Sequence, residues 1–324
     1  MRSVLVTGAT GFLGGALTRR LLLDGVRVFA LGRNQEKLSE LASFGAATLQ
    51  CDLADLPDDV QPDACDVVVH AAALSSPWGR ARDFERANVA GTANALRLAG
   101  RVGARRFINI SSPSIYFRFA DQDRLREDDP LPAPVNAYAA TKRRAEDLVS
   151  GASAFETITL RPRGLYGPAD TALLPRLLKA ATTRPLPLMR GGEAATDLTY
   201  IDDVIESILA AMVAPPSASG QAFNISGGVA LPVKMVAERA GAKAGINVRW
   251  RQVPWQLVRG FATASERVCA ILPQRPEPVV TAYSAGLFAF RQTLNIQKAE
   301  QLLGWRPKVS FDEGLEKTFV GRTE

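Results

Sequence analysis

Short apolar runs alternate with helical patterns through the first half of the chain. The runs are rich in Val, Ile and Leu and end in glycine or polar residues, as buried strands of a parallel sheet do. Strands are predicted at 3–7, 26–31, 66–70 and 106–110, and another ends near Cys51. Helices are predicted at 13–23, 35–44, 82–102 and 137–150. This alternation predicts an α/β fold with a doubly wound parallel sheet.

The second half is less regular and predicts a smaller C-terminal α/β lobe. Proline and glycine cluster at 161–168, 184–192, 214–220 and 273–278. Helices are predicted at 172–182, 202–213, 232–244, 254–271 and 297–303. We therefore expect a first domain over 1–165 and a substrate lobe over 166–324, with later segments crossing back to the first domain.

Composition narrows the function classes. Only three cysteines and one histidine occur among 324 residues, with no C-x-x-C pair, which argues against a disulfide framework and predicts no metal site. A reducing cytoplasm fits this usage. No apolar run is long enough for a membrane span. The basic residues are scattered without interleaved aromatics, which argues against nucleic acid.

The positive charge lies wholly in the second half. The first 160 residues carry 19 basic and 19 acidic side chains, whereas the remainder carries 20 and 14. An anionic substrate and a merely basic surface both explain this excess.

A glycine-rich segment follows the first strand and opens the first helix. In T-G-A-T-G-F-L-G, residues 7–14, glycines permit a tight turn and bring backbone N–H groups and a helix N-terminus close to a pyrophosphate. The segment predicts a dinucleotide site on a Rossmann domain. Its expected contact residues are Gly8, Thr10, Gly11, Phe12 and Leu13.

The ends of the next strands refine the cofactor. Gly32 stands where NAD-preferring enzymes carry an acidic residue, and Arg33 follows, so we expect NADP to be preferred over NAD. Asp52 can accept from the adenine amino group, with Leu53 packing on the ring; alternatively, Asp52 caps a local turn. Ala71, Ala72 and Ala73 would let the backbone approach the ribose and nicotinamide, whereas His70 is interpreted as structural.

A tyrosine and a lysine four residues apart are the catalytic candidates. Tyr138 and Lys142 share one helical face, and a nearby ammonium lowers the pKa of a phenol. The tyrosine can then exchange a proton with an alcohol or ketone oxygen. A hydroxyl at the end of the 106–110 strand can stabilise charge on the same oxygen, and Ser111, Ser112 and Ser114 compete for this role.

The chain resembles the extended short-chain dehydrogenases/reductases over nearly its whole length. Matching motifs are the 7–14 loop, D-L at 52–53, H-A-A-A at 70–73, N-V-A-G-T at 88–92, S-S-P-S-I-Y at 111–116, Y-A-A-T-K at 138–142, L-R-P-R-G-L-Y-G-P at 160–168, Y-I-D-D-V at 200–204, F-N-I-S-G-G at 223–228 and K-A-E-Q-L-L-G-W-R-P at 298–307. The resemblance implies that Ser112 is the catalytic hydroxyl, that Asn88 shapes the active site, and that Pro162 borders the cofactor. It also implies a homodimer.

Three positions favour simple redox chemistry over sugar-nucleotide chemistry. Gly164, Thr196 and Pro113 stand where the sugar-nucleotide epimerases and dehydratases of this family usually carry asparagine, arginine and an acidic residue. The apolar stretch 254–272 resembles the 3β-hydroxysteroid dehydrogenase-like branch. It predicts an apolar, sterol-like or long-chain β-keto substrate. The stretch itself could line the substrate cleft or contact a membrane surface, and packing within the lobe or at a dimer interface explains it equally well.

The expected reaction is hydride transfer between NADP(H) and a secondary alcohol or ketone. The alternatives are a sugar-nucleotide epimerase or dehydratase and a non-catalytic NADP-binding regulator.

Overall fold

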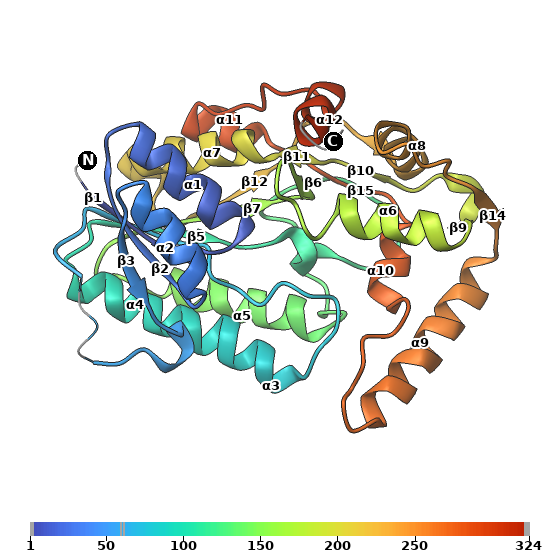
Figure 1. Cartoon of the computed structure of the whole chain (residues 1–324), viewed down its shortest axis with the longest axis horizontal. Helices are drawn as coiled ribbons and strands as arrows, with labels where there is room; N and C mark the ends of the chain where they lie inside the picture. The colour runs from blue at the N-terminus through green and yellow to red at the C-terminus, as the bar shows by residue number, and fades with distance from the viewer. Residues whose placement is uncertain (1–2, 59, 61, 321–324) are drawn as a thin grey trace.

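The computed structural model describes residues 3–58, 60 and 62–320 and contains a seven-stranded parallel sheet (Figure 1). The strand order is β12-β7-β5-β4-β1-β2-β3. The strands are β1 (Ser3–Thr7), β2 (Arg27–Gly32), β3 (Ala47–Gln50), β4 (Val67–His70), β5 (Arg106–Ile110), β7 (Glu156–Pro162) and β12 (Gln221–Ile225). The predicted Rossmann-like doubly wound sheet is confirmed.

Helices cover both faces of this sheet because its strands are apolar on both sides. In β1, Val4 and Val6 face one core cluster, whereas Leu5 faces the other. The helices packed into the Val4 cluster are α1 (Phe12–Leu23), α2 (Gln35–Ser43), α6 (Leu174–Thr183), α7 (Ile201–Val213), α8 (Val233–Lys243), α11 (Gln297–Leu303) and α12 (Phe311–Phe319). Those in the Leu5 cluster are α4 (Gly91–Arg101) and α5 (Ala137–Ser150).

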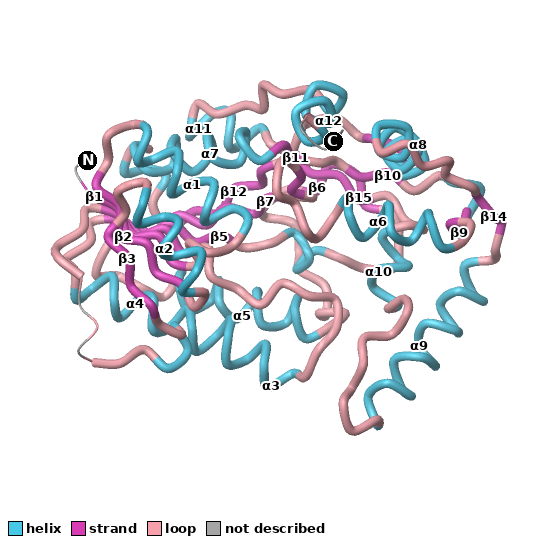
Figure 2. Tube along the Cα trace, viewed as in Figure 1, coloured by secondary structure: helices cyan, strands magenta, loops and turns pink. Residues whose placement is uncertain are grey.

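The smaller lobe is built around a second sheet of order β13-β10-β15-β6 (Figure 2). Its strands are β6 (Gln122–Leu125), β10 (Ala195–Thr196), β13 (Leu231–Pro232) and β15 (Gln292–Leu294). Two-stranded sheets join β8 (Leu165–Tyr166) to β11 (Thr199–Tyr200) and β9 (Leu186–Leu188) to β14 (Trp250–Gln252). The remaining helices are α9 (Trp255–Ile271) and α10 (Ala282–Leu287).

Each half of the sequence contributes elements to the unit formed mainly by the other half. Strand β12 and helix α7 come from the second half but belong to the large sheet and its core, whereas β6 comes from the first half but pairs in the small sheet. A boundary at residue 165 therefore does not separate the two units cleanly, because the chain passes between them more than once.

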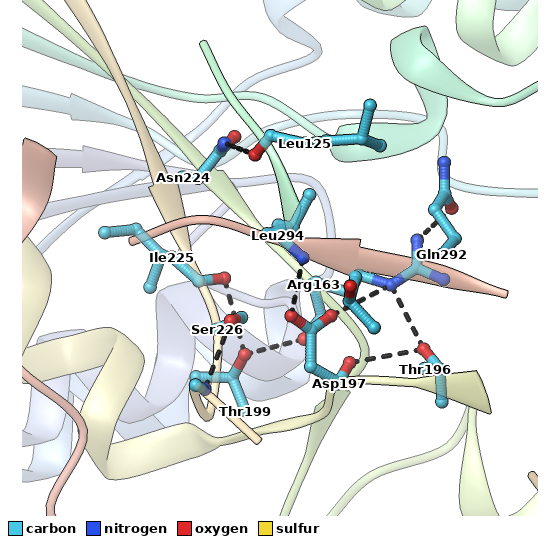
Figure 3. Close-up of polar contacts among 12 residues, drawn as sticks. Leu125, Arg163, Thr196, Asp197, Thr199, Asn224, Ile225, Ser226, Gln292 and Leu294 are labelled. Carbon is cyan, nitrogen blue, oxygen red and sulfur yellow. Dashed lines mark hydrogen bonds and ion pairs between the residues drawn. The ribbon is translucent and has the colours of Figure 1, made fainter. Parts of the chain in front are cut away.

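A buried ion pair fixes the small sheet to the end of β7 (Figure 3). Arg163 Nε lies 3.2 Å from Asp197 Oδ1 and donates to Thr196 Oγ1 at 3.1 Å, and Asp197 Oδ2 accepts from the Leu294 N–H at 2.8 Å. Thr199 Oγ1 donates to the Arg163 carbonyl at 2.6 Å. Because both charged groups are buried, removing either partner would leave an uncompensated charge.

One predicted helix is interrupted. The segment predicted as a single helix over 82–102 consists of α3 (Ala81–Phe84), a π-helical segment η2 (Glu85–Ala90) and α4. The widened turn contains Asn88, whose side chain bonds to the neighbouring chain segment rather than to solvent. A π-turn of this kind re-aims a side chain, and such turns are frequent at functional sites.

Candidate active site

The carboxyl ends of five parallel strands lie along one edge of the large sheet. The register pairs Thr7 of β1 with His70 of β4, His70 with Asn109 of β5, and Pro162 of β7 with Ile225 of β12. In open α/β sheets, ligands bind at this edge. The glycine loop, Ala71–Ala73, the serines after β5 and Pro162 therefore lie along one side of the molecule.

Helix α5 brings the tyrosine and the lysine to this edge. Its N-terminus is fixed by Asn136, whose Oδ1 accepts from the Ala139 N–H at 2.8 Å. Tyr138 in the first turn is half-buried, and Lys142, one turn later, is buried. Lys142 Nζ donates to the Ile110 carbonyl at the end of β5, at 2.8 Å. This bond holds the ammonium beside the strand that ends in the catalytic serine candidates.

Burial also tunes the lysine. It lowers the pKa of Lys142 to about 8, and the charge of Glu146 opposes this shift only in part. At neutral pH the side chain is therefore still the ammonium. The site therefore holds a buried positive charge one helical turn after Tyr138.

Of the three serine candidates, Ser112 is the least buried. Ser111 and Ser114 are buried, and their hydroxyls have no partner among the described residues. Ser112 Oγ accepts from the Ser114 N–H at 3.2 Å. Because that contact uses a lone pair, the Ser112 O–H remains available to donate to a substrate oxygen.

Asn88 connects the loop after β4 to helix α5. Its Oδ1 accepts from the Leu74 N–H at 2.7 Å, and its Nδ2 donates to the Leu74 carbonyl at 3.2 Å and to Thr141 Oγ1 at 3.1 Å. Asn88 thus joins the loop after β4 to α5 at Thr141, which lies between Tyr138 and Lys142 in the sequence. These contacts make Asn88 a positioning residue.

His70 is internal to the fold. The hydroxyls of Thr7 and Thr92 lie 2.8 and 2.9 Å from its two ring nitrogens. Burial, aided by the charge of Lys142, lowers its pKa to about 3, so the imidazole is neutral. The geometry agrees with the predicted structural role.

The glycine loop has the shape that a pyrophosphate requires. Gly8 has φ +70°, and a Cβ there would lie 2.7 Å from the Ala72 backbone; a Cβ at Gly14 would collide with the Gly8 carbonyl oxygen. Gly11 is exposed and precedes α1, whose N-terminus has no side-chain cap. Free N–H groups and close backbone approach fit a bound dinucleotide phosphate.

The loop after β2 carries one cation, Arg33, and no carboxylate, and the first turn of α2 adds Glu36 and Lys37. A Cβ at Gly32 would lie 2.6 Å from Thr10 Cγ2, so an acidic side chain would not fit there without displacing Thr10. Arg33 is exposed, and Lys37 Nζ donates to the Thr10 carbonyl at 3.4 Å. Sequence reasoning missed Lys37, although its position one turn into α2 could have indicated it.

Asp52 takes the turn-capping role that the sequence left open. Its side chain accepts from the Ala54 N–H at 3.1 Å and from Arg86 Nη1 at 3.0 Å. Burial acts to raise its pKa, but these hydrogen bonds and the charges of Arg86 and Arg33 lower it overall. Leu53 is buried in the core, so little of its surface faces outward. Adenine contacts by Asp52 and Leu53 remain predictions.

Phe117, Phe119 and Tyr283 form an aromatic wall that the sequence did not predict, and Tyr283 lies near enough to Tyr138 for an electrostatic interaction. The Tyr283 ring contacts Phe117 at 4.9 Å between centroids, and Phe117 contacts Phe119 at 5.3 Å. Burial raises the pKa of Tyr283 to about 12, the charge of Arg163 acts to lower it, and Tyr138 acts to raise it. Tyr283 therefore remains an O–H donor close to Tyr138. Its position in α10, far along the chain, concealed it.

The comparisons with known proteins agree with this geometry. The model of the NAD dependent epimerase/dehydratase family matches residues 4–226. A 2-alkyl-3-oxoalkanoate reductase from Stenotrophomonas maltophilia is 32% identical over 97% of this chain and 97% of its own. A decarboxylating sterol-4-alpha-carboxylate 3-dehydrogenase from Schizosaccharomyces pombe is 32% identical over 99% and 97%. The structure of UDP-glucuronic acid 4-epimerase from Bacillus cereus in complex with NAD superposes with a TM-score of 0.73 at 22% identity, covering 98% and 97%.

Proposed function

Because the chain belongs to the NAD dependent epimerase/dehydratase family, we propose that it is an oxidoreductase that reduces an apolar ketone, or oxidises the matching secondary alcohol. The observation that carries this proposal is the 2.8 Å hydrogen bond from the buried Lys142, one turn after Tyr138, to the Ile110 carbonyl, two residues before Ser112. This bond lies at the sheet edge that the glycine loop also occupies. When bound, the nicotinamide supplies or accepts the hydride. The chain's own residues bind, orient and exchange the proton.

The proton path follows from the contacts. Ser112 donates to the substrate oxygen, and Tyr138 passes its phenolic proton to that oxygen as charge develops on it. Lys142, fixed on the Ile110 carbonyl, stabilises the phenolate that Tyr138 leaves behind. Asn88 holds the loop after β4 against α5, so that these groups stay in register.

The proposed substrate is a β-keto or β-hydroxy acid, in which the carboxylate is attached to the carbon next to the reacting carbon. The names of the two curated relatives above share this arrangement, a 3-oxo or 3-hydroxyl function beside a carboxylated carbon. The aromatic wall of Phe117, Phe119 and Tyr283 suits an apolar body. The Tyr283 hydroxyl, kept protonated, can donate to the carboxylate.

Sugar-nucleotide chemistry is disfavoured by the backbone itself. Gly164 has φ +53°, and a Cβ there would collide with the Leu198 side chain. An asparagine reaching for nucleotide phosphates at this position would therefore be strained and crowded. Thr196 is also engaged, because its hydroxyl accepts from the buried Arg163.

The functional test is cofactor consumption with matched substrates. The enzyme should oxidise NADPH in the presence of a 2-alkyl-3-oxoalkanoate and turn over the corresponding methyl ester much more slowly. Conversion of UDP-sugars without net consumption of NADPH, and no activity on the keto acid, would refute the proposal.

NADP is the proposed cofactor because Arg33 and Lys37 flank the site of the ribose 2′-phosphate. Arg33→Asp should raise the Kd for NADP at least about tenfold and leave the Kd for NAD within about threefold, since a guanidinium–phosphate contact is replaced by repulsion. Isothermal titration calorimetry gives both constants. Arg184→Asp, a charge reversal at an exposed arginine at the end of α6, is the control. Tighter binding of NAD than of NADP by the unaltered protein would contradict the assignment.

The last two proposals concern the cellular location and the oligomeric state. Among the helices of the described part of the chain, none is both long and apolar enough to cross a bilayer. A reducing cytoplasm and a homodimer remain proposals from cysteine usage and family resemblance.

A further inference from the structure

Helix α9 exposes an apolar face that the body of the protein does not cover. The exposed fractions are 66% for Leu257, 59% for Phe261, 55% for Val268 and 82% for Ile271. At 100° per residue these four side chains fall within an arc of about 80°. We call them the outer face of α9. Figure 1 shows α9 projecting from the small lobe at the edge of the molecule.

The opposite side of α9 packs against the body of the protein. Ala262 is buried, the Trp255 ring contacts Phe290 at 5.2 Å, and the Arg259 guanidinium lies over the Phe119 ring at 5.0 Å. Glu266 accepts from the Ala282 N–H at 2.9 Å. The outer face is therefore not needed for packing α9 onto the protein, and its exposure calls for another occupant.

The segment of the chain that contains α9 is strongly basic. Residues 249–275 contain five arginines, no lysine and a single acidic residue, Glu266. All five arginines are exposed, and none forms an ion pair with a described residue. They are Arg249, Arg251, Arg259, Arg267 and Arg275. On the helix itself, Arg267 lies about 40° outside the arc of the outer face, whereas Arg259 faces Phe119 on the covered side. An apolar helix face in such a basic segment has the composition of an interfacial helix on an anionic membrane.

We propose that the outer face of α9 docks on an anionic lipid bilayer surface. A second copy of the chain is the less suitable occupant, because a twofold contact would bring the same arginines against one another. An anionic headgroup layer complements them instead, while Leu257, Phe261, Val268 and Ile271 enter the acyl boundary.

The docked helix would stand beside the active site. From α9, Trp255 contacts Phe119 at 5.8 Å, Phe119 contacts Phe117, and Phe117 contacts Tyr283 next to Tyr138. An apolar substrate could thus pass from the bilayer along the aromatic wall. This delivery step rests on the proposed function, whereas the docking itself does not.

Vesicle flotation tests the docking. The protein should float with vesicles of phosphatidylcholine containing 30 mol% phosphatidylglycerol, on the order of tenfold more than with phosphatidylcholine alone, and 0.5 M NaCl should reduce this difference. Phe261→Glu combined with Ile271→Glu should reduce flotation at least about tenfold. Leu23→Glu combined with Val213→Glu, which alters two exposed apolar residues elsewhere, should float like the wild type.

Two further readouts separate the outcomes. The double variant in α9 should keep the melting temperature of the wild type and its activity on a short, water-soluble keto acid. Activity on the keto acid tests the proposed function, and flotation tests the docking, so failure of one proposal can be distinguished from failure of the other. No flotation of the wild type, or equal flotation of the α9 variant, would overturn the proposal. A dimer seen by light scattering that the α9 variant dissociates, without vesicle binding, would also overturn it.

Discussion

Replacing Tyr138 with phenylalanine should lower kcat by about a thousandfold while leaving the Kd for NADPH within about twofold. The substitution removes the hydroxyl that transfers the proton, and general acid–base catalysis contributes about 10²–10⁴-fold. The ring and its contact with Phe84, 6.4 Å between centroids, are retained. Steady-state kinetics with NADPH and a keto acid measures kcat, and fluorescence titration measures the Kd.

The control for Tyr138 is the second phenol of the site. Tyr283→Phe should raise KM for the keto acid and change kcat by less than about tenfold, because Tyr283 is proposed to bind the substrate and not to transfer the proton. Near-normal kcat in Tyr138→Phe, or an equal loss in both variants, would contradict the assigned proton donor.

Replacing Lys142 with methionine should abolish turnover and stabilise the cofactor-free protein. The pKa of Lys142 is lowered from 10.5 to about 8, because burial disfavours the charged form. Below pH 8 the folded chain holds an ammonium at a cost of about 3 kcal/mol, using 1.36 kcal/mol per pKa unit. Methionine removes that cost and loses the bond to the Ile110 carbonyl, so a net gain of about 1–2 kcal/mol is expected at pH 7 from urea unfolding.

The pH dependence of this gain has a definite sign. Between pH 8 and 10.5 the unfolded chain binds more protons at Lys142 than the folded chain, so wild-type stability rises with pH in this window. The advantage of Lys142→Met should therefore shrink from pH 8 to pH 10.5. Lys142→Arg, which keeps the charge, should show no gain. A destabilised methionine variant at pH 7 would contradict the account of a strained catalytic lysine.

Local signals in the sequence were sufficient for the first half of the fold. Helix α5 begins and ends where predicted, at Ala137 and Ser150, because Asn136 caps it and Gly151 follows it. The conformation of the glycine loop is likewise predictable from its own residues, since Gly8 adopts a positive φ that favours glycine. The proposed catalytic pair, Tyr138 and Lys142, could be predicted because both residues lie on this one helix.

Features that depend on distant contacts were not predictable. Helix α12 was missed although it carries local signals, a Ser310 cap that accepts from the Glu313 N–H and apolar residues at 311, 315 and 319; its Gly314 is explained only by packing, because a Cβ there would collide with the Tyr166 hydroxyl. The capping of Asp52 could be foreseen, but its partner Arg86 lies 34 residues away. Tyr283 carries no motif and meets Phe117 only through the packing of α10. These residues acquire their roles from tertiary contacts that single-sequence patterns do not encode.

The central claim is direct hydride transfer to a ketone carbon, and deuterium transfer tests it most directly. The enzyme would be incubated with NADPH deuterated at C4 on each face in turn, together with a 2-alkyl-3-oxoalkanoate, and the product analysed by mass spectrometry. We predict one deuterium on the carbinol carbon for every NADP formed, from one face only. A reduced product without deuterium from either face, or no product while a UDP-sugar is epimerised, would contradict the account.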